Sequence, residues 1–256
     1  MLLETKNLTR YFGGVKAVDG VDIEVKEGTI KGIIGPNGAG KTTFFHLLSG
    51  HLPPQKGWIK FKGEIINHLP PFERARKGIG RVFQQPSPFE NLTLMENILI
   101  SLDISNSPSL FTSLLRLPSL GKSEKEKEKQ AIEILHFLNL EKKLHHFPSS
   151  LTHFERRKME IGRVLALNPS LLLLDEPTAG LSYREKEEIK EIIWELKEKG
   201  LTILVVEHDM ELITDICEEV VVLNFGKKIA EGSPWEIKNN PLVKEVYLGE
   251  EYASGS

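Results

Sequence analysis

A glycine-rich segment between two apolar runs constrains this chain more than any other feature. The segment GPNGAGKT, residues 35–42, matches the pattern G-x-x-x-x-G-K-[ST]. TIKGII before it predicts a short buried strand, and FFHLLSG after it predicts a helix that stops at Gly50. A strand that turns through such a loop into a helix is suited to bind phosphate. A glycine-rich turn without a ligand is the alternative.

Each residue type in this loop has its own chemical use. Glycines let successive backbone N–H groups turn toward one point, and the helix N-terminus adds its dipole. Lys41 supplies a positive charge for the outer phosphates, and the Thr42 hydroxyl can ligate Mg²⁺. We therefore predict that phosphate groups bind with Mg²⁺ along the segment Gly35, Pro36, Asn37, Gly38, Ala39, Gly40, Lys41, Thr42 and Thr43.

A second apolar run, LLLLDEP, ends in two acidic residues, Asp175 and Glu176. A continuous apolar run predicts a buried parallel strand, and ligands bind at the carboxyl edge of a parallel sheet. Asp175 is suited to hold Mg²⁺, directly or through water, and Glu176 to polarise the attacking water as a general base. The pair alone could also cap a helix, but the phosphate loop favours the catalytic interpretation.

Two further polar residues are candidates for the site. His208 follows TILVVE, and Gln84 lies in RVFQQP. Either residue alone could be a structural hydrogen-bonding group. At the same sheet edge as the two acids, His208 is predicted to contact the γ-phosphate.

The order of strands and helices predicts an α/β fold with a mainly parallel sheet. Expected strands are 3–8, 18–25, 29–34, a pair within 58–66, 171–175, 202–207 and 219–224. Expected helices are 92–102, 124–140, 155–167, 183–199, 210–216 and 241–248. The segment 103–123 is expected to be an irregular insertion. It is either a mobile surface loop or a partner-binding patch made by Leu110, Phe111, Leu114 and Leu115.

Composition excludes several classes of protein. The chain has 256 residues, 40% of them apolar and 27% charged, with a formal net charge of −3, so it is neither largely disordered nor a general nucleic-acid-coating protein. Its one cysteine, Cys217, cannot form an internal disulfide and points to a reducing compartment. No apolar run approaches the ~18–20 residues that cross a bilayer, and the first residues do not resemble a signal peptide. We expect a soluble, cytoplasmic chain.

The ordered set GPNGAGKT, VFQQ, SSLTHFERRKMEIGR, LLLLDEPTAGLS and VVEHD resembles the ATP-binding subunits of ABC transporters, over nearly the whole chain. The closer resemblance is to the ATPases of branched-chain amino acid importers. It is carried by LTRYFGGVKAVDGVDIEV, IGRVFQQPSPFENLTLMENIL, the insertion at 103–123 and the ending GKKIAEGSPWEIKNNPLVKEVYLGEEY. Related lipopolysaccharide-export and urea-import ATPases share that ending.

The resemblance implies an arrangement of subdomains. Residues 1–88 and 149–256 would form a P-loop NTPase core with an antiparallel β subdomain. Residues from about 89 to 148 would form an α-helical subdomain that docks on a transmembrane partner, and 253–256 a disordered tail.

The resemblance also implies roles for single residues. Phe12, or Tyr11, would stack on adenine, although Phe12 could be a plain core aromatic. Gln84 would reach Mg²⁺ and the attacking water, and His208 would be the switch histidine. The subunit would hydrolyse ATP and power a transporter from the inner face of the membrane. Its partners would be a second ATPase subunit, permease subunits and, indirectly, a solute-binding protein.

One motif departs from the family pattern Leu-Ser-Gly-Gly-Gln, the signature loop that faces the ATP of the other subunit. Here it consists of Leu151, Thr152, His153, Phe154 and Glu155. Both glycines are replaced, which adds side chains where backbone should approach phosphate. Glu155 adds a negative charge where an anion should bind. The later loop AGLS, 179–182, has Ser182 where Asp or Asn is usual.

These departures affect the surface that the chain presents to its partner subunit. Its own phosphate loop and the acidic residues Asp175 and Glu176 match the family pattern. The hypothesis is an asymmetric heterodimer in which the site completed by 151–155 turns ATP over slowly. Alternatively, the loop adjusts and supports normal ATP turnover. A homodimer is then also possible. Two other functions remain open: a soluble ABC-type ATPase that acts on DNA or ribosomes, and an ATP-sensing regulatory subunit.

Overall fold

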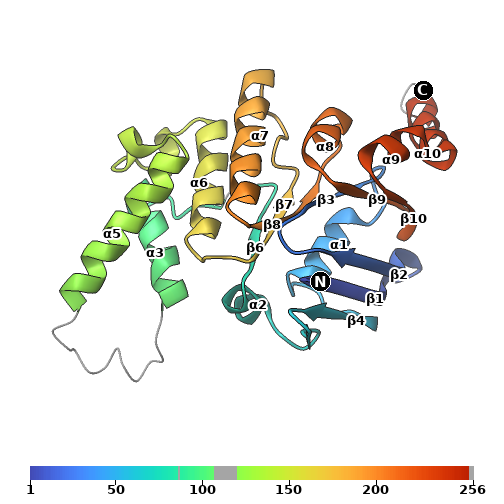
Figure 1. Ribbon diagram of the computed structural model, residues 1–256, viewed down its shortest axis with the longest axis horizontal. Helices are drawn as coiled ribbons and strands as arrows, with labels where there is room; N and C mark the ends of the chain where they lie inside the picture. The colour runs from blue at the N-terminus through green and yellow to red at the C-terminus, as the bar shows by residue number, and fades with distance from the viewer. Residues whose placement is uncertain (86, 107–119, 254–256) are drawn as a thin grey trace.

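Two sheets form the framework of the molecule (Figure 1). The structure is a computed structural model that describes residues 1–85, 87–106 and 120–253. A six-stranded sheet has the order β10-β9-β3-β8-β7-β6 and is parallel except for β10, which pairs antiparallel with β9. Its strands are β3 (Ile30–Ile34), β6 (Ile79–Val82), β7 (Leu171–Asp175), β8 (Thr202–Val206), β9 (Glu219–Asn224) and β10 (Lys227–Gly232).

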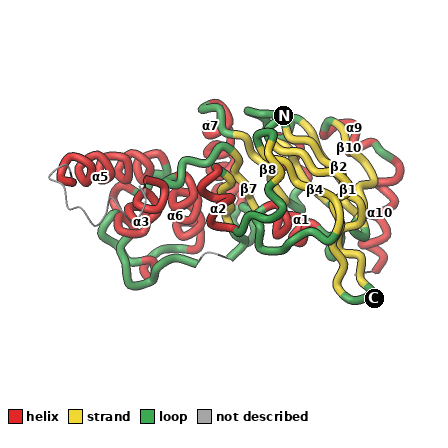
Figure 2. Tube along the Cα trace, turned by 90° about the horizontal axis from the view of Figure 1, so that it is seen from below, coloured by secondary structure: helices red, strands yellow, loops and turns green. Residues whose placement is uncertain are grey.

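The second sheet is antiparallel, in the order β2-β1-β4-β5. It contains β1 (Leu3–Phe12), β2 (Val15–Val25), β4 (Lys56–Phe61) and β5 (Glu64–Ile65). The expected fold class, a mainly parallel sheet with an antiparallel β sheet and helices, is confirmed. Figure 2 shows the strands gathered at one end of the molecule and the helices α3, α5 and α6 at the other.

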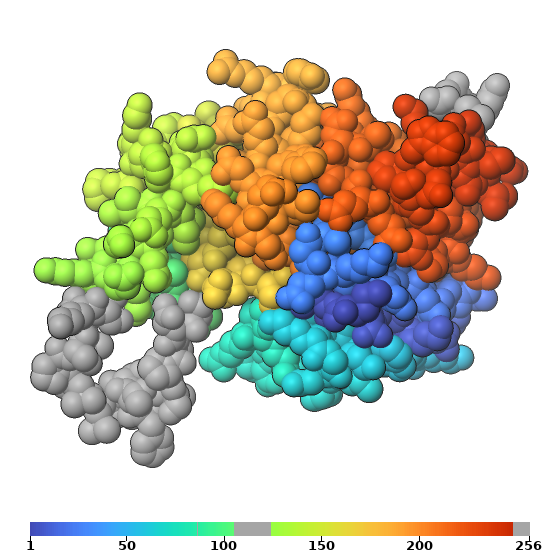
Figure 3. Space-filling view, in the orientation of Figure 1, coloured from blue at the N-terminus to red at the C-terminus, as the bar shows by residue number. Residues whose placement is uncertain are grey.

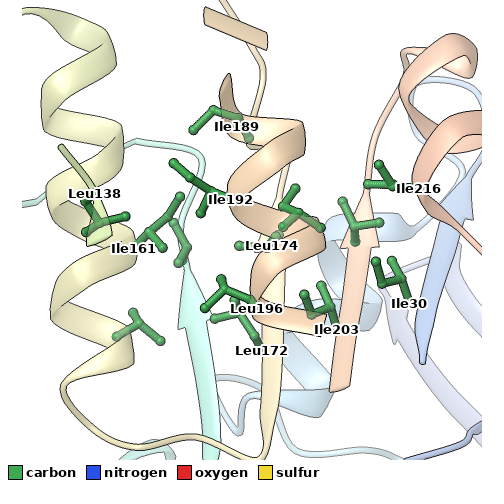
Figure 4. Packing of buried hydrophobic residues seen from close by; sticks show 14 of the residues in the cluster. Ile30, Leu138, Ile161, Leu172, Leu174, Ile189, Ile192, Leu196, Ile203 and Ile216 are labelled. Atoms are coloured by element: carbon green, nitrogen blue, oxygen red, sulfur yellow. The ribbon is translucent and has the colours of Figure 1, made fainter. Parts of the chain in front are cut away.

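The central strands are buried on both faces, which explains their continuous apolar runs. Along β7, Leu171 and Leu173 belong to one apolar cluster. That cluster also includes residues of helix α1 (Lys41–Leu48) and of the antiparallel sheet. Leu172 and Leu174 face a second cluster, shown in Figure 4, which includes residues of α7 (Tyr183–Glu198) and α8 (Met210–Ile216). The alternation of side chains along a strand therefore places helices on both faces.

Three helices gather beside the edge of the parallel sheet (Figure 1), in the part of the molecule coloured green to yellow in the space-filling view of Figure 3. They are α3 (Leu94–Asn106), α5 (Leu120–Phe137) and α6 (His153–Leu165). Helix α6 contacts both of the others and also strand β6. It therefore joins the helical region to the sheet. Among the described residues, no helix is long and apolar enough to span a bilayer.

Several expected boundaries are wrong, and among the described residues some strands and α-helices were not expected. The helix predicted at 92–102 is α3, which continues to Asn106, and the helix predicted at 124–140 begins at Leu120, so the irregular insertion is shorter than 103–123. The suggested patch at Leu110, Phe111, Leu114 and Leu115 lies outside the described residues. Residue 253, placed in a disordered tail, ends helix α10 (Pro241–Ala253). The missed elements are β6, β10, α2 (Pro71–Lys77) and α9 (Pro234–Asn239).

Candidate nucleotide site

The phosphate loop lies between β3 and α1, as its sequence predicts. Gly35 and Gly40 have φ values of 147° and 104°, and a Cβ on either would come within 2.1 Å of a backbone oxygen. Both positions therefore require glycine. The Lys41 side chain is buried, and its ammonium donates to the carbonyl oxygens of Gly35 and Pro36 at 2.6 and 2.9 Å. The Lys41 ammonium therefore holds the loop through two of the loop's own carbonyl groups.

A cavity of about 190 Å³ opens over this loop. Residues of the phosphate loop form its floor, and Val15 and Ala17 of β2 contribute to its wall. Glu176 and His208 also line it, although they follow β7 and β8 far along the chain. The tertiary fold therefore brings together the phosphate loop, the predicted base and the predicted switch histidine at the carboxyl edge of the sheet.

Glu176 is the centre of a hydrogen-bond network. It has a positive φ of 47°, a conformation that is costly for a residue with a side chain. One carboxylate oxygen lies 2.6 Å from Nε2 of His208, and the other accepts from Nε2 of Gln84 at 2.5 Å. The three residues singled out in separate sequence segments are thus in direct contact. Such bonds aim the carboxylate, which a general base requires.

Asp175, one position earlier, is buried and forms an ion pair that the sequence analysis missed. Its carboxylate accepts from Nη2 of Arg81 at 2.8 Å, and Nη1 of Arg81 donates to the Ser49 hydroxyl at 3.0 Å. Burial lowers the pKa of Arg81, and its hydrogen bond with Asp175 opposes that change. Arg81 lies in the short strand β6, which was not predicted, so its side chain could not be placed in advance.

Glu207 is a second residue that the sequence analysis did not single out. It is buried and accepts from both the backbone N–H and the hydroxyl of Thr178, at 2.9 and 2.5 Å, and from the N–H of His208. It joins the loop after β7 to the loop after β8. An acid directly before His208, in an otherwise apolar run, was the available signal.

The three predicted metal ligands have donor types that suit Mg²⁺. A hydroxyl (Thr42), a carboxylate (Asp175) and an amide (Gln84) are the hard oxygen donors that Mg²⁺ prefers, together with phosphate oxygens. Phe12, the predicted adenine contact, is 44% exposed at the end of β1, with the Arg10 guanidinium 5.0 Å from its ring centroid. Phe12 is not among the described residues that line the cavity.

The loop 151–155 is held by hydrogen bonds and an ion pair within the chain. Thr152 caps helix α6: its hydroxyl accepts from the Glu155 N–H at 3.2 Å, and its own N–H donates to the Glu155 carboxylate at 3.0 Å. Glu155 also pairs with Lys143 at 2.6 Å. Burial raises the pKa of Glu155, but the bonds from Lys143 and Thr152 outweigh it, and the net pKa is lowered. The negative charge of Glu155 is therefore paired within the chain.

Phe154 points inward from this loop. It is 9% exposed, and the Lys158 ammonium lies 4.6 Å from its ring centroid and pairs with Glu188 at 2.6 Å. His153, by contrast, is exposed. A Cβ added to Gly180 would lie 3.7 Å from Cε1 of the His153 ring. The two segments that depart from the family pattern, 151–155 and 179–182, are thus neighbours in the structure.

Ser182 is the N-cap residue of helix α7. It precedes helix α7, and its N–H and hydroxyl both donate to the Glu185 carboxylate, at 2.8 and 2.7 Å. Serine and aspartate are similarly effective at this position of a helix. The substitution therefore preserves the start of α7.

The comparisons with known proteins agree with this geometry. A profile described as ABC transporter matches residues 18–179, and one described as branched-chain amino acid ATP-binding cassette transporter matches residues 227–253. The chain is 39% identical to the high-affinity branched-chain amino acid transport ATP-binding protein BraF of Pseudomonas aeruginosa, over 97% of this chain and 98% of that protein. It is 38% identical to LivG of Escherichia coli, with the same coverage.

Solved structures show the same fold. An ATP-binding cassette of an ABC transporter in its ADP conformation superposes with a TM-score of 0.84 at 35% identity, covering 97% of this chain and 98% of that one. A dimeric bacterial ABC transporter cassette has a TM-score of 0.78 at 28% identity, covering 91% and 99%. With the phosphate cradle, the glutamate network and these relatives together, the chain belongs to the ABC transporter family as an ATP-hydrolysing, ATP-binding subunit.

Proposed function

We propose that this chain powers the import of branched-chain amino acids by hydrolysing ATP·Mg²⁺. The assignment of cargo is supported by the profile match over 227–253 and by relatives that are named for branched-chain amino acid transport and align over 97% of the chain. The observation that carries the chemistry is the placement of Glu176 on the wall of the cavity above the phosphate loop, bonded to Gln84 and His208.

Each residue of the site has a distinct task in this proposal. Lys41 and the backbone N–H groups of 35–43 bind the phosphates, and Thr42, Gln84 and Asp175 hold Mg²⁺. Glu176 orients a water in line with the γ-phosphate, and His208 contacts that phosphate. Mg²⁺, when bound, neutralises charge on the phosphate oxygens. Rate enhancement comes mainly from positioning and electrostatic stabilisation.

The subunit works with partners. A second ATPase subunit completes the site from across a dimer interface, as suggested by the dimeric cassette of the same fold. Permease subunits transmit the motion across the membrane and hold this chain at its inner, cytoplasmic face. A solute-binding protein delivers the amino acid to the permeases.

The dimer is asymmetric in this proposal. The signature loop is Leu151, Thr152, His153, Phe154 and Glu155, and its features disfavour close approach to a partner's phosphate. His153 adds an exposed side chain at the start of α6, and the N–H of Thr152 is already bonded to Glu155. A partner ATPase with an intact loop would complete the active site on this chain. The site completed by this chain's loop would be slow.

Reconstitution tests both parts. The chain is combined with branched-chain amino acid permeases, a second ATPase and a binding protein in proteoliposomes, and ATP-driven leucine uptake is measured. We expect uptake that is lost in Lys41→Ala, and turnover by the isolated chain far below the ~1–100 s⁻¹ of many phosphoryl-transfer enzymes. Uptake unaffected by Lys41→Ala rejects the proposed function, and family-like turnover by the isolated chain rejects the asymmetry. ATP binding without uptake would support the regulatory sensor instead.

A further inference from the structure

A row of polar residues runs along helix α1 from the phosphate loop toward strand β6. Thr42, His46 and the C-cap residue Ser49 are spaced four and three residues apart, so they lie on the same side of the helix. The Ser49 hydroxyl accepts from Nη1 of Arg81 at 3.0 Å, and Nη2 of the same guanidinium donates to the Asp175 carboxylate at 2.8 Å. The row therefore begins at one predicted metal ligand, Thr42, and ends at the cation that is paired with another, Asp175.

Strand register places Arg81 and Asp175 on the same face of the parallel sheet. Arg81 in β6 is paired with Leu173 in β7, two residues before Asp175, and alternate side chains of a strand point to the same face. Leu173 belongs to the apolar cluster that includes residues of α1. Arg81 is 8% exposed and Asp175 4%. The ion pair is therefore an internal contact that the sheet itself holds in place.

Aromatic rings surround the Arg81 guanidinium. Its central carbon lies 4.5 Å from the ring centroid of Phe83 and 5.8 Å from that of Phe45. Charges interact more strongly in such surroundings than in water, and a single buried charge without a partner is costly. Arg81 and Asp175 therefore compensate each other's charge.

Two histidines near the ion pair do not supply this positive charge. Burial and the charge of Arg81 lower the pKa of His46, although Asp175 has the opposite effect. Nδ1 of His51 lies 2.9 Å from the Ser49 hydroxyl, and burial and Arg81 also lower the pKa of His51. Both imidazoles are therefore neutral at pH 7, and the charge that opposes Asp175 in this cluster is that of Arg81.

We propose that Arg81 is a positioning residue that makes the binding of Mg²⁺ at Asp175 depend on nucleotide. Arg81 holds one carboxylate oxygen of Asp175, which fixes the direction of the whole carboxylate. The same guanidinium cancels the negative charge that would attract a divalent cation by itself. The phosphates of ATP bring new negative charge to Thr42 and Asp175, so the cation is bound only together with them. This inference rests on the proposed function, because the predicted metal belongs to bound ATP.

Titration of the full-length chain with Mn²⁺ tests the role of Arg81 without nucleotide and without turnover. Mn²⁺ prefers the same oxygen donors as Mg²⁺, and its free concentration is measured by electron paramagnetic resonance at pH 8, which favours the ionised carboxylate. Arg81→Gln keeps a neutral donor but removes the charge, and we expect it to bind Mn²⁺ about tenfold more tightly than the parent, or more. Arg81→Lys keeps the charge and should remain within about threefold of the parent. A purely structural role of Arg81 would lower stability without raising the affinity for Mn²⁺.

Asp175→Asn shows where the cation binds. In the Arg81→Gln background this substitution should remove the gain in Mn²⁺ affinity. No gain in folded Arg81→Gln, or a gain that persists with Asp175→Asn, overturns the inference.

The parent chain decides the question if Arg81→Gln does not fold. Without nucleotide, the parent and Asp175→Asn should bind Mn²⁺ equally, within about twofold, because Asp175 does not hold the cation alone. A tenfold loss of affinity in Asp175→Asn would overturn the inference. Failure of the parent to bind Mg·ATP rejects the proposed function instead, and the Mn²⁺ titration still decides the role of Arg81.

Discussion

At Glu176 the backbone and the side chain are both under constraint. The residue has φ of 47° and bonds Gln84 and His208 with its two carboxylate oxygens. Strained residues that the surrounding structure holds in place are typical of active sites. The strand-terminal position of Glu176 follows from its sequence, but its two partners come from loops that only the folded sheet brings together.

Glu176→Gln tests the role of this carboxylate. The amide keeps the size of the side chain but cannot accept a proton, so turnover should fall at least 10²-fold while Mg·ATP still binds. Turnover is measured by phosphate release in the reconstituted transporter, and affinity by titration calorimetry. Retained turnover would reject Glu176 as the base, and lost binding would show that the residue holds the nucleotide.

Cys217 illustrates a residue whose environment decides its chemistry. It is 7% exposed, and burial raises the pKa of its thiol. Because the thiolate is the reactive species, we expect no modification by iodoacetamide at pH 8 in the native chain and rapid modification in denaturant. Fast labelling of the folded chain, followed by mass spectrometry, would contradict the burial shown here.

Helix α6 shows how one element can combine several tasks. Its first turn includes the capping pair Thr152 and Glu155, its buried face includes Phe154, and its arginines hold the segment after β6. The sequence placed this helix at 155–167, two residues late, because the capping role of Thr152 was not recognised. Phe154, which replaces a glycine of the family pattern, therefore also contributes to the packing of the core.

Phe154→Gly, which restores a glycine of the family pattern, should destabilise the chain rather than repair it. Removing a buried Phe side chain costs about 3–5 kcal/mol, and glycine inside a helix adds about 1 kcal/mol. The free energy of unfolding is measured by urea titration. His153→Ala, at an exposed neighbour, should change it by less than about 0.5 kcal/mol. Equal effects of the two substitutions would show that Phe154 is not part of the core.

The start of helix α8 offers a test of pH dependence. Asp209 caps this helix and pairs with Lys186 of α7 at 2.7 Å, and that hydrogen bond, against some desolvation, holds the pKa of Asp209 below its usual value. A carboxylate whose pKa is lower in the folded state stabilises at pH values above its unfolded pKa. That stabilisation is lost as the pH falls through the folded pKa.

Asp209→Asn keeps a good capping residue and removes the charge. We expect it to lower the free energy of unfolding by roughly 0.5–1 kcal/mol at pH 7, a difference that shrinks steadily below about pH 4. The control is Glu211→Gln in the same helix, expected to be within about 0.5 kcal/mol of the parent. A difference that does not vary from pH 7 to pH 3 would show that the ion pair contributes nothing.

Across the whole molecule, nucleotide should act as a stabilising ligand. The cavity joins the phosphate loop to residues after β7 and β8, so a bound nucleotide ties together distant parts of the chain. At 100 times its dissociation constant, a ligand that binds only the folded state adds about 2.7 kcal/mol. Mg·ATP should therefore raise Tm clearly, measured by scanning calorimetry. Adding EDTA should remove much of the rise in Tm, and the substitution Lys41→Ala should remove all of it. A Tm shift that persists in Lys41→Ala would show that the nucleotide binds elsewhere.

The sequence by itself determined the phosphate loop, the strand-terminal acids and the mainly parallel α/β core. Those features are local: a glycine pattern, a period of apolar residues and a charge at the end of a run need no knowledge of distant neighbours. It did not predict β6 or β10, which are short and partly polar, nor the correct limits of α3 and α5. Only the tertiary structure decided the partners of each charge. Arg81 meets Asp175, Lys143 meets Glu155, and Arg157 meets the carbonyls of Phe83 and Gln84. The reason is that side-chain contacts between distant segments depend on how helices and strands pack, and a one-dimensional pattern does not encode that packing in any local window.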